Sequence, residues 1–295
     1  MTAILASEPS SIGRVLDQAF RLFRVGVGGL LPYTIAAAVV SLMLQLLQAR
    51  ALARVGAPGA ALALPRISPA FALLLLVAVL AFLIIHMAAL HRLAALDAGT
   101  GSNGESWRVG LNRTPALIGA TLLLGLLLGL TFGLLFGIGG GMATAGGGGA
   151  VALLGIVIVT VAILGAIYVF VRVMYYVPEI VLRSAGPMDS LRGTWRITRG
   201  HFWRISILVG VLVLAMIVLY VILLAVAAAV LAVLGGTGRM TVDTTVLVTQ
   251  VLSSLLVVLT LPLSLATTLA IWHDLRLRSE GTDIAARIDK LPPRS

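Results

Sequence analysis

Residues 205–238 read ISILVGVLVLAMIVLYVILLAVAAAVLAVLGGTG, and none of these 34 residues carries a charge. An α-helix rises about 1.5 Å per residue, so about 20 apolar residues cross a hydrocarbon core roughly 30 Å thick. The stretch is therefore long enough to span a membrane as a helix. Arg204 and Arg239 flank it and mark where the chain returns to water.

The rest of the chain has the same apolar character. Of its 295 residues, 60% are hydrophobic and only 11% are charged, and the mean hydropathy is +1.10. Soluble domains are about half apolar and about a quarter charged, so this composition excludes a soluble globular protein. The absence of cysteine excludes a disulfide framework, a thiolate metal site and a cysteine nucleophile.

Four further charge-free intervals predict the remaining spans. Intervals of 25, 25, 58 and 30 uncharged residues begin after Arg24, Arg66, Arg113 and Asp243. The longest interval has a glycine cluster at 139–149, which predicts two spans joined by a hairpin. We therefore predict an all-α, polytopic membrane protein with six transmembrane helices. The predicted spans are 28–49, 69–91, 115–138, 150–176, 205–234 and 246–272.

Lysine and arginine are distributed unequally between the two sides of these spans. The side that holds both ends of the chain receives 17 of them, and the opposite side receives 4. Short cytoplasmic loops are enriched in Lys and Arg, so we expect both ends in the cytoplasm of a bacterial inner membrane. The net charge of +10 is then a topology signal, and we expect no nucleic-acid partner.

Internal similarity predicts three repeats. An aromatic residue followed by two arginines recurs at 20–24 and 195–199, with a weaker copy at 107–108. Each repeat would contain a short amphipathic helix at the membrane interface and two spans. We predict a single integral membrane domain with repeat units at 10–99, 100–186 and 187–281 and a cytoplasmic tail at 282–295.

The three predicted interfacial helices differ in expected length and in how regular their apolar pattern is. The second contains Gly104 and Gly110 and is expected to form only a turn or two, whereas the third begins near Pro187 and ends or weakens at Gly200. The first has a continuous apolar stripe at helical spacing. That stripe consists of Ile12, Val15, Leu16, Ala19, Phe20 and Phe23.

Basic residues on these helices are the candidate binding residues. Arg192, Arg196 and Arg199 are expected to share one helical face beside Trp195, and their repeat-related counterparts are Arg21 and Arg24. One interpretation is that they only anchor the bundle and set its topology. The other is that they bind membrane lipids, in particular anionic phospholipid headgroups, or another negatively charged ligand.

Five segments carry a family resemblance: IGRVLDQAFRLFR at 12–24, PEIVL at 178–182, GP at 186–187, SLRGTWRITRG at 190–200 and DLRLRSEG at 274–281. They resemble the glycerophosphoryl diester phosphodiesterase membrane-domain family and the similar YciC-like bacterial inner-membrane proteins. In some members this domain precedes a soluble catalytic barrel, which needs about 250 residues. Because about 20 residues follow the last span here, the resemblance implies a membrane module associated with phospholipid metabolism and no catalytic domain.

The sequence contains no recognisable catalytic motif. It has no His-Glu-x-x-His zinc helix, no Gly-x-Ser-x-Gly elbow and no phosphate-binding loop, so we expect no enzyme activity, metal or cofactor. The spans lack central acidic residues, which disfavours ion-coupled transport, and Arg172 is expected to extend out to the interface. We expect a scaffold or accessory protein of phospholipid and membrane homeostasis. The alternative is a transporter or lipid-translocating protein for an uncharged or amphipathic substrate.

A glycine face marks the third span. Gly125, Gly129, Gly133 and Gly137 recur every four residues and therefore lie on one side of a helix. Small residues allow a second backbone to approach closely in lipid. We predict close packing against the fourth span, and the alternative is contact with a second copy of the chain or another membrane protein.

Overall fold

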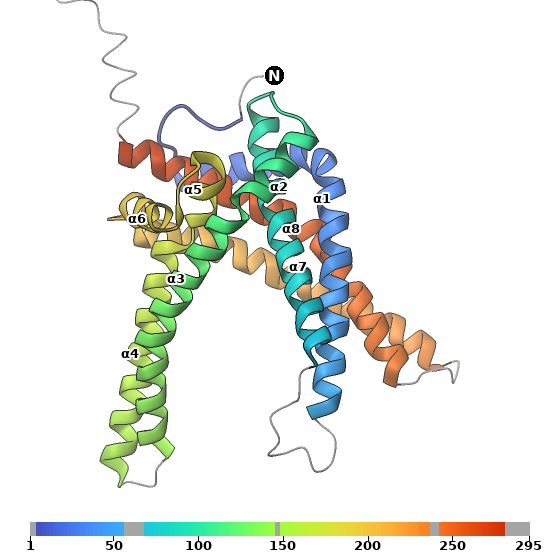
Figure 1. Ribbon diagram of the computed structural model, residues 1–295, viewed down its shortest axis with the longest axis vertical. Coiled ribbons are helices and arrows are strands. Elements are labelled where there is room, and N and C mark those ends of the chain that lie inside the picture. Colours follow the sequence, from blue (N-terminus) through green and yellow to red (C-terminus); the bar gives the residue numbers. More distant parts are fainter. Residues whose placement is uncertain (1–3, 56–67, 145–147, 237–241, 281–295) are drawn as a thin grey trace, which may run out of the picture. The chain divides into compact units, whose positions relative to one another are not determined.

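The computed structural model describes residues 4–55, 68–144, 148–236 and 242–280, which contain helices and no strands. This confirms the predicted all-α class (Figure 1). The helices are α1 (Ile12–Val55), α2 (Pro69–Asp97), α3 (Asn103–Thr144), α4 (Gly149–Val173), α5 (Tyr176–Arg183), α6 (Pro187–Ile197), α7 (Phe202–Gly236) and α8 (Val242–Glu280).

Six helical segments of the described chain are long and apolar enough to cross a membrane. Each contains one of the six predicted spans, except that the fifth span was predicted to end one residue later, so the protein is a multi-pass membrane protein. Many large apolar side chains on them are exposed, including Leu122 at 67% and Leu214 at 62%, as expected of surfaces that face lipid. The segments are Ile12–Ala49, Pro69–Asp97, Asn103–Thr144, Gly149–Arg183, Phe202–Val233 and Thr244–Glu280.

The chain divides into two compact units, each described by itself below. Of the described residues, those in 1–6, 11–114 and 208–270 form unit 1, and those in 7–10, 115–207 and 271–295 form unit 2. The boundaries fall inside α3, α7 and α8 and do not coincide with the predicted repeat borders. The threefold repeat stays a prediction, and the tail at 282–295 lies outside the described residues.

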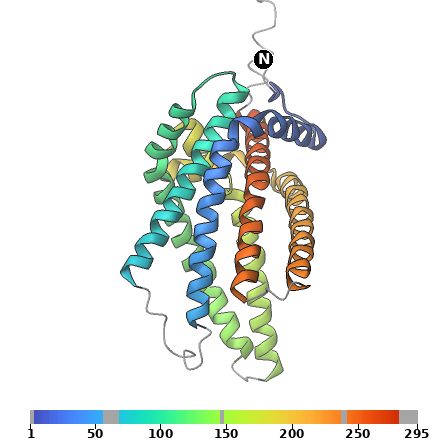
Figure 2. The ribbon, with the colours of Figure 1, turned by 90° about the vertical axis from the view of Figure 1, so that its right-hand side faces the viewer.

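The first two interfacial helices are not separate elements, contrary to the prediction. Residues 12–24 continue into the first span as α1, although Figure 2 shows the first part of α1 at a steep angle to the rest. Glycines and Pro32 within α1 account for the bend. Within the predicted apolar stripe, Val15 and Ala19 are buried whereas Phe20 is 61% exposed.

The second copy is continuous with α3, so the expected break at its glycines is also wrong. Gly110 allows α3 to pack closely against α2, because a Cβ atom at this position would lie 2.9 Å from the Ile84 carbonyl oxygen of α2. Beside this contact, the Trp107 ring stacks on Tyr33 of α1 at a centroid distance of 5.0 Å. The fully buried Tyr33 donates a hydrogen bond of 3.2 Å to the Asn103 carbonyl. The middle copy therefore forms part of the core of unit 1.

Unit 2 contains the hairpin of α3 and α4, which lie side by side in Figure 1. The predicted packing of the Gly125–Gly137 face against the fourth span is wrong, because no described atom lies within 4 Å of a Cβ placed at any of those four glycines. The helices approach at Gly139 and Gly155 instead. A Cβ at Gly139 would lie 2.9 Å from the Gly155 carbonyl oxygen. Periodicity defined a glycine face but not the direction in which it points.

The fourth membrane-spanning segment, Gly149–Arg183, is interrupted by a turn. α4 stops at Val173, and a turn at Met174 and Tyr175 leads into α5, which contains Pro178. A proline lacks the amide hydrogen for the helical bond to the carbonyl four residues back, and its ring clashes with that carbonyl. Pro178 therefore accounts for the break in the helix at Met174, four residues before it.

Candidate functional site

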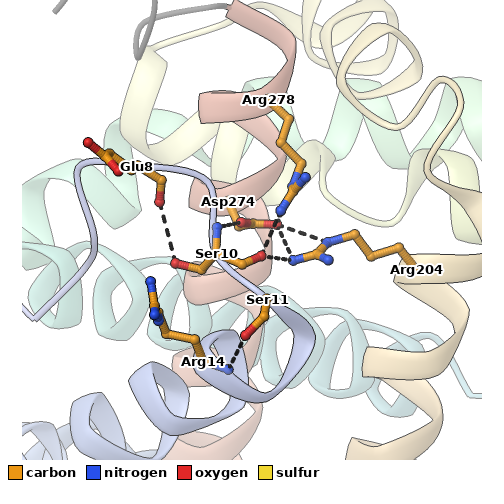
Figure 3. A network of polar contacts seen from close by, with 7 residues as sticks. All are labelled: Glu8, Ser10, Ser11, Arg14, Arg204, Asp274 and Arg278. Carbon is orange, nitrogen blue, oxygen red and sulfur yellow. Dashed lines mark hydrogen bonds and ion pairs between the residues drawn. The ribbon is translucent and has the colours of Figure 1, made fainter. Parts of the chain in front are cut away.

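In one polar cluster of unit 2, the side chains form hydrogen bonds and ion pairs with one another. The Asp274 carboxylate accepts hydrogen bonds from the Ser10 backbone at 2.8 Å, from Arg204 at 2.9 and 3.1 Å and from Arg278 at 3.0 Å (Figure 3). Both arginines also donate to the Ser10 carbonyl. Every acceptor in the cluster has a donor, so it fastens the segment before α1 to α8 and serves as a structural support.

His201 precedes α7 beside this cluster. Burial lowers the pKa of His201, and the charges of Arg278 and Arg204 lower it further against the opposite effect of Asp274. The imidazole is therefore neutral at pH 7 and adds no positive charge to the two arginines.

The side chains of a second polar cluster of unit 2 line a pocket. The pocket has a volume of about 490 Å³ and lies between α5 and α6. The lining contains both positive and negative side chains, which is the composition expected of a site for a charged ligand. It consists of Glu179, Arg183, Ala185, Asp189, Arg192, Gly193 and Arg196.

The start and spacing of α6 explain how its residues reach the pocket. Pro187 occupies the first turn of α6, where its missing amide hydrogen costs no helical hydrogen bond. Asp189, Arg192, Gly193 and Arg196 then follow at i, i+3, i+4 and i+7, so they share one helical face. This face is turned toward α5, since all four residues line the pocket together with Glu179 and Arg183 of α5.

The arginines of the pocket differ in their partners. Arg183 forms an ion pair of 3.0 Å with Glu280 of α8, a carboxylate that also pairs with Arg276. Arg192 and Arg196 form no ion pair with any residue in the described part of the chain. Their two guanidinium groups are therefore available to an anionic group of a ligand.

Glu179 is the functional candidate that sequence reasoning missed. Its side chain is only 2% exposed, and its Oε1 accepts a hydrogen bond of 3.0 Å from Trp272 Nε1. Its Oε2 lies beside Gly193 at the pocket and has no hydrogen-bond partner within the described ranges. The only signal in the sequence was one acidic residue within an apolar segment, next to Pro178.

An apolar groove of about 460 Å³ lies on the neighbouring face of α6. Leucines of α3 between 123 and 130, Val169 of α4 and Trp195 of α6 contribute to its lining. Arg192 lines both this groove and the polar pocket. A charged pocket and an apolar groove therefore meet at one arginine side chain.

Arg172 connects α4 to α6 beneath this site. It is 4% exposed and packs against α6, and its extension to the membrane interface stays a prediction. Its guanidinium lies 4.5 Å over the Trp195 ring, and its Nη2 donates a hydrogen bond of 3.0 Å to the Trp195 carbonyl. Thr198 completes the connection by donating to the Arg172 carbonyl at 3.0 Å.

Comparison with known proteins places the site within a family. Residues 114–275 match the family described as Domain of unknown function (DUF7847). The chain belongs to this family. The DUF7847 segment contains every residue that lines the pocket and the groove. No curated protein and no solved structure matches the chain. The resemblance to the phosphodiesterase membrane-domain family stays a prediction.

The structure separates the binding residues that the sequence grouped together. Within the DUF7847 segment, Arg192 and Arg196 line the pocket, whereas Trp195 lines the groove. Arg199 lies in the turn after α6, which ends at Ile197, and does not line the pocket, so its predicted place on one face with Arg192 and Arg196 stays a prediction. Gly200 follows with a φ of 79°, so the expected helix end at this glycine is confirmed.

The counterparts in the first repeat belong to unit 1. Arg21 and Arg24 are exposed on α1 and line a pocket of about 310 Å³ with Ile4 and Val25. Among the described residues, no acidic side chain contributes to this lining. Arg21 and Arg24 therefore have a different chemical setting from Arg192 and Arg196, which share their pocket with two carboxylates.

Proposed function

We propose that this DUF7847 protein binds a membrane phospholipid at the cytoplasmic surface of a bacterial inner membrane and serves there as a non-enzymatic accessory factor of membrane homeostasis. The observation that carries the proposal is the position of Arg192, which lines both the polar pocket and the apolar groove. A phospholipid has the same arrangement, because its phosphate lies at the junction between a polar headgroup and apolar chains.

The chemistry of the pocket suits a phosphate diester. Arg192 and Arg196 are one helical turn apart, and neither forms an ion pair with a described residue. Guanidinium groups donate to phosphate oxygens in pairs, with a geometry that a lysine ammonium does not reproduce. The groove would hold an acyl chain against the leucines of α3 and the Trp195 ring.

Retention of lipid by the purified protein tests this proposal. Native mass spectrometry in detergent would compare wild type with Arg192→Gln/Arg196→Gln. Loss of two charge-assisted contacts is expected to reduce bound phospholipid about tenfold or more. Arg192→Lys/Arg196→Lys, which keeps the charge that sets topology, should also lose lipid if the geometry of the guanidinium matters.

Arg199→Gln is the matched control, because Arg199 is exposed near the same site but does not line the pocket. Equal lipid retention by wild type and Arg192→Gln/Arg196→Gln would leave these arginines with an anchoring role only. A lipid-translocating function would use the same site. It would show itself as protein-dependent movement of labelled phospholipid between the leaflets of a vesicle.

A further inference from the structure

We propose that the pocket between α5 and α6 selects a phospholipid whose headgroup carries a primary amine, and that the Glu179 carboxylate receives the ammonium group. This inference rests on the proposed function and adds the headgroup class. It replaces the anionic headgroup expected from the arginines alone, because the pocket contains carboxylates that the arginine pattern did not indicate.

The charge balance of the pocket favours a zwitterion. Three arginines and two acidic residues line it, and Arg183 pairs with Glu280, a carboxylate that it shares with Arg276. The remaining formal charges are those of Arg192 and Arg196 against Glu179 and Asp189, two positive and two negative. A lipid with a net negative charge would place its excess charge beside two carboxylates. A headgroup with one negative and one positive charge and no net charge can place its phosphate at the arginines and its cation at the carboxylates.

Glu179 has the geometry of a receptor for a cation. Its Oε1 is held by Trp272, which fixes the carboxylate plane and leaves Oε2 at the pocket. The Glu179 residue is 2% exposed as a whole and lines the pocket, so a ligand in the pocket can reach Oε2 while the rest of the side chain is held in place. An ammonium group supplies up to three donors and the opposite charge, so its binding would complete the hydrogen bonding of Glu179.

Gly193 keeps this oxygen accessible. A Cβ atom at Gly193 would lie 3.4 Å from Glu179 Oε2 and 3.5 Å from Glu179 Cδ, so a side chain here would begin to cover the carboxylate. Gly193 precedes Arg196 by three positions and follows Arg192 directly on α6. The phosphate-binding and amine-binding groups therefore lie within about one helical turn of each other.

This spacing suits ethanolamine or serine headgroups, in which two carbon atoms separate the phosphate oxygen from the amine. Choline has a quaternary nitrogen with no hydrogen to donate, so its headgroup would leave Glu179 Oε2 without a hydrogen bond. Glycerol headgroups offer neutral hydroxyl groups, whose hydrogen bonds to a carboxylate are weaker than those of an ammonium. Ethanolamine is the best match of these, because its phospholipid has no net charge.

Competition between headgroups tests the inference. The intact protein would be incorporated into vesicles of equal parts dioleoyl phosphatidylethanolamine and dioleoyl phosphatidylglycerol, extracted gently and analysed by native mass spectrometry. Wild type is expected to retain more phosphatidylethanolamine. Glu179→Gln keeps the size of the side chain and the acceptor for Trp272 but removes the charge. The ratio of retained phosphatidylethanolamine to phosphatidylglycerol should therefore fall about tenfold, as expected for the loss of one charge-assisted contact.

Asp17→Asn is the matched control, because it removes one exposed acidic charge from α1 and should leave the ratio unchanged. Vesicles with dioleoyl phosphatidylcholine in place of phosphatidylethanolamine should show no preference over phosphatidylglycerol. If Glu179→Gln does not fold, Gly193→Val keeps every charge and covers Oε2, and it should lower the ratio in the same way.

The outcomes distinguish this inference from the proposed function. Preferred retention of phosphatidylglycerol by wild type, or an unchanged ratio in the folded Glu179→Gln protein, would overturn selection of the amine. Lipid loss in Arg192→Gln/Arg196→Gln would then still support phospholipid binding. If wild type retains no phospholipid from either vesicle, the proposed function and this inference both fail.

Discussion

The guanidinium group of Arg172 lies 4.5 Å from the centre of the Trp195 ring and also donates a hydrogen bond to the carbonyl of the same residue. One arginine in the last turn of α4 therefore holds both the side chain and the backbone of α6. Because α6 contributes to both the pocket and the groove, this contact positions the candidate site.

We expect Arg172→Lys to lower the free energy of unfolding by about 1–3 kcal/mol, because lysine loses the planar stacking on Trp195 and the directed hydrogen bond. Thermal unfolding in detergent, followed by tryptophan fluorescence, measures the change. Arg199→Lys is the control, since Arg199 is exposed and lies beyond the end of α6. An equal effect of the two substitutions would contradict a structural role for Arg172.

Alanine substitutions should have opposite effects on stability at the glycines where α3 and α4 meet and at the glycines of the face from Gly125 to Gly137. Gly155→Ala is expected to lower the melting temperature, because the new Cβ would meet the backbone of Gly139 and Ala143. Gly129→Ala places its methyl group in open space and gains helix propensity, about 1 kcal/mol, so it should be neutral or stabilising. Melting curves of both variants in one detergent provide the comparison.

A lower melting temperature for Gly129→Ala together with an unchanged one for Gly155→Ala would mean that the hairpin packs on its other glycine face. If Gly129→Ala changes only the oligomeric state in size-exclusion chromatography, the face from Gly125 to Gly137 contacts a second copy. That result would support the alternative expected from the sequence.

Asp274→Asn should destabilise unit 2 strongly. Asp274 is 3% exposed and is the only acidic partner of Arg204 and Arg278 among the described residues. The loss is expected to cost about 2–3 kcal/mol, because two partly buried arginines, 17% and 27% exposed, lose their charged acceptor. Thermal unfolding should show the loss, and limited proteolysis should show faster cleavage near Ser10. Asp17→Asn, at an exposed position, should change neither measurement.

The orientation can be tested with reporter fusions. Because 17 of the 21 basic residues lie on one side of the predicted spans, fusions after Asp97 and Arg183 should report the cytoplasm. Fusions within 50–66, 139–149 and 236–243 should report the opposite side. A cytoplasmic signal from 139–149 would contradict the hairpin of α3 and α4 as a pair of spans.

The six long helices were predictable because charge is so costly in lipid that intervals without Asp, Glu, Lys or Arg mark the spans directly. The beginning of α6 at Pro187 and its end before Gly200 followed from the backbone preferences of these two residues. Such signals are local. They depend on the chemistry of a single residue or a single segment and need no knowledge of its neighbours.

The candidate site was less predictable because it depends on contacts between distant residues. Glu179 and Trp272 are 93 positions apart, and no local pattern connects a carboxylate on α5 with an indole on α8. Arg199 illustrates a second limit: its spacing from Arg192 indicated a shared face, but the helix ends two residues before it. Spacing predicts a face only as far as the helix continues.

The contact between Ser10 and Asp274 joins residues 264 positions apart, which has a consequence for biosynthesis. α8 is the last of the described helices to leave the ribosome, so Asp274 is absent while α1 and α7 insert. Until then Arg204 lacks its carboxylate partner, and the bond from the Ser10 backbone amide to Asp274 has not formed. Closure of this contact is therefore a late step of assembly, and a nascent chain arrested before α8 would expose its first segment to membrane proteases.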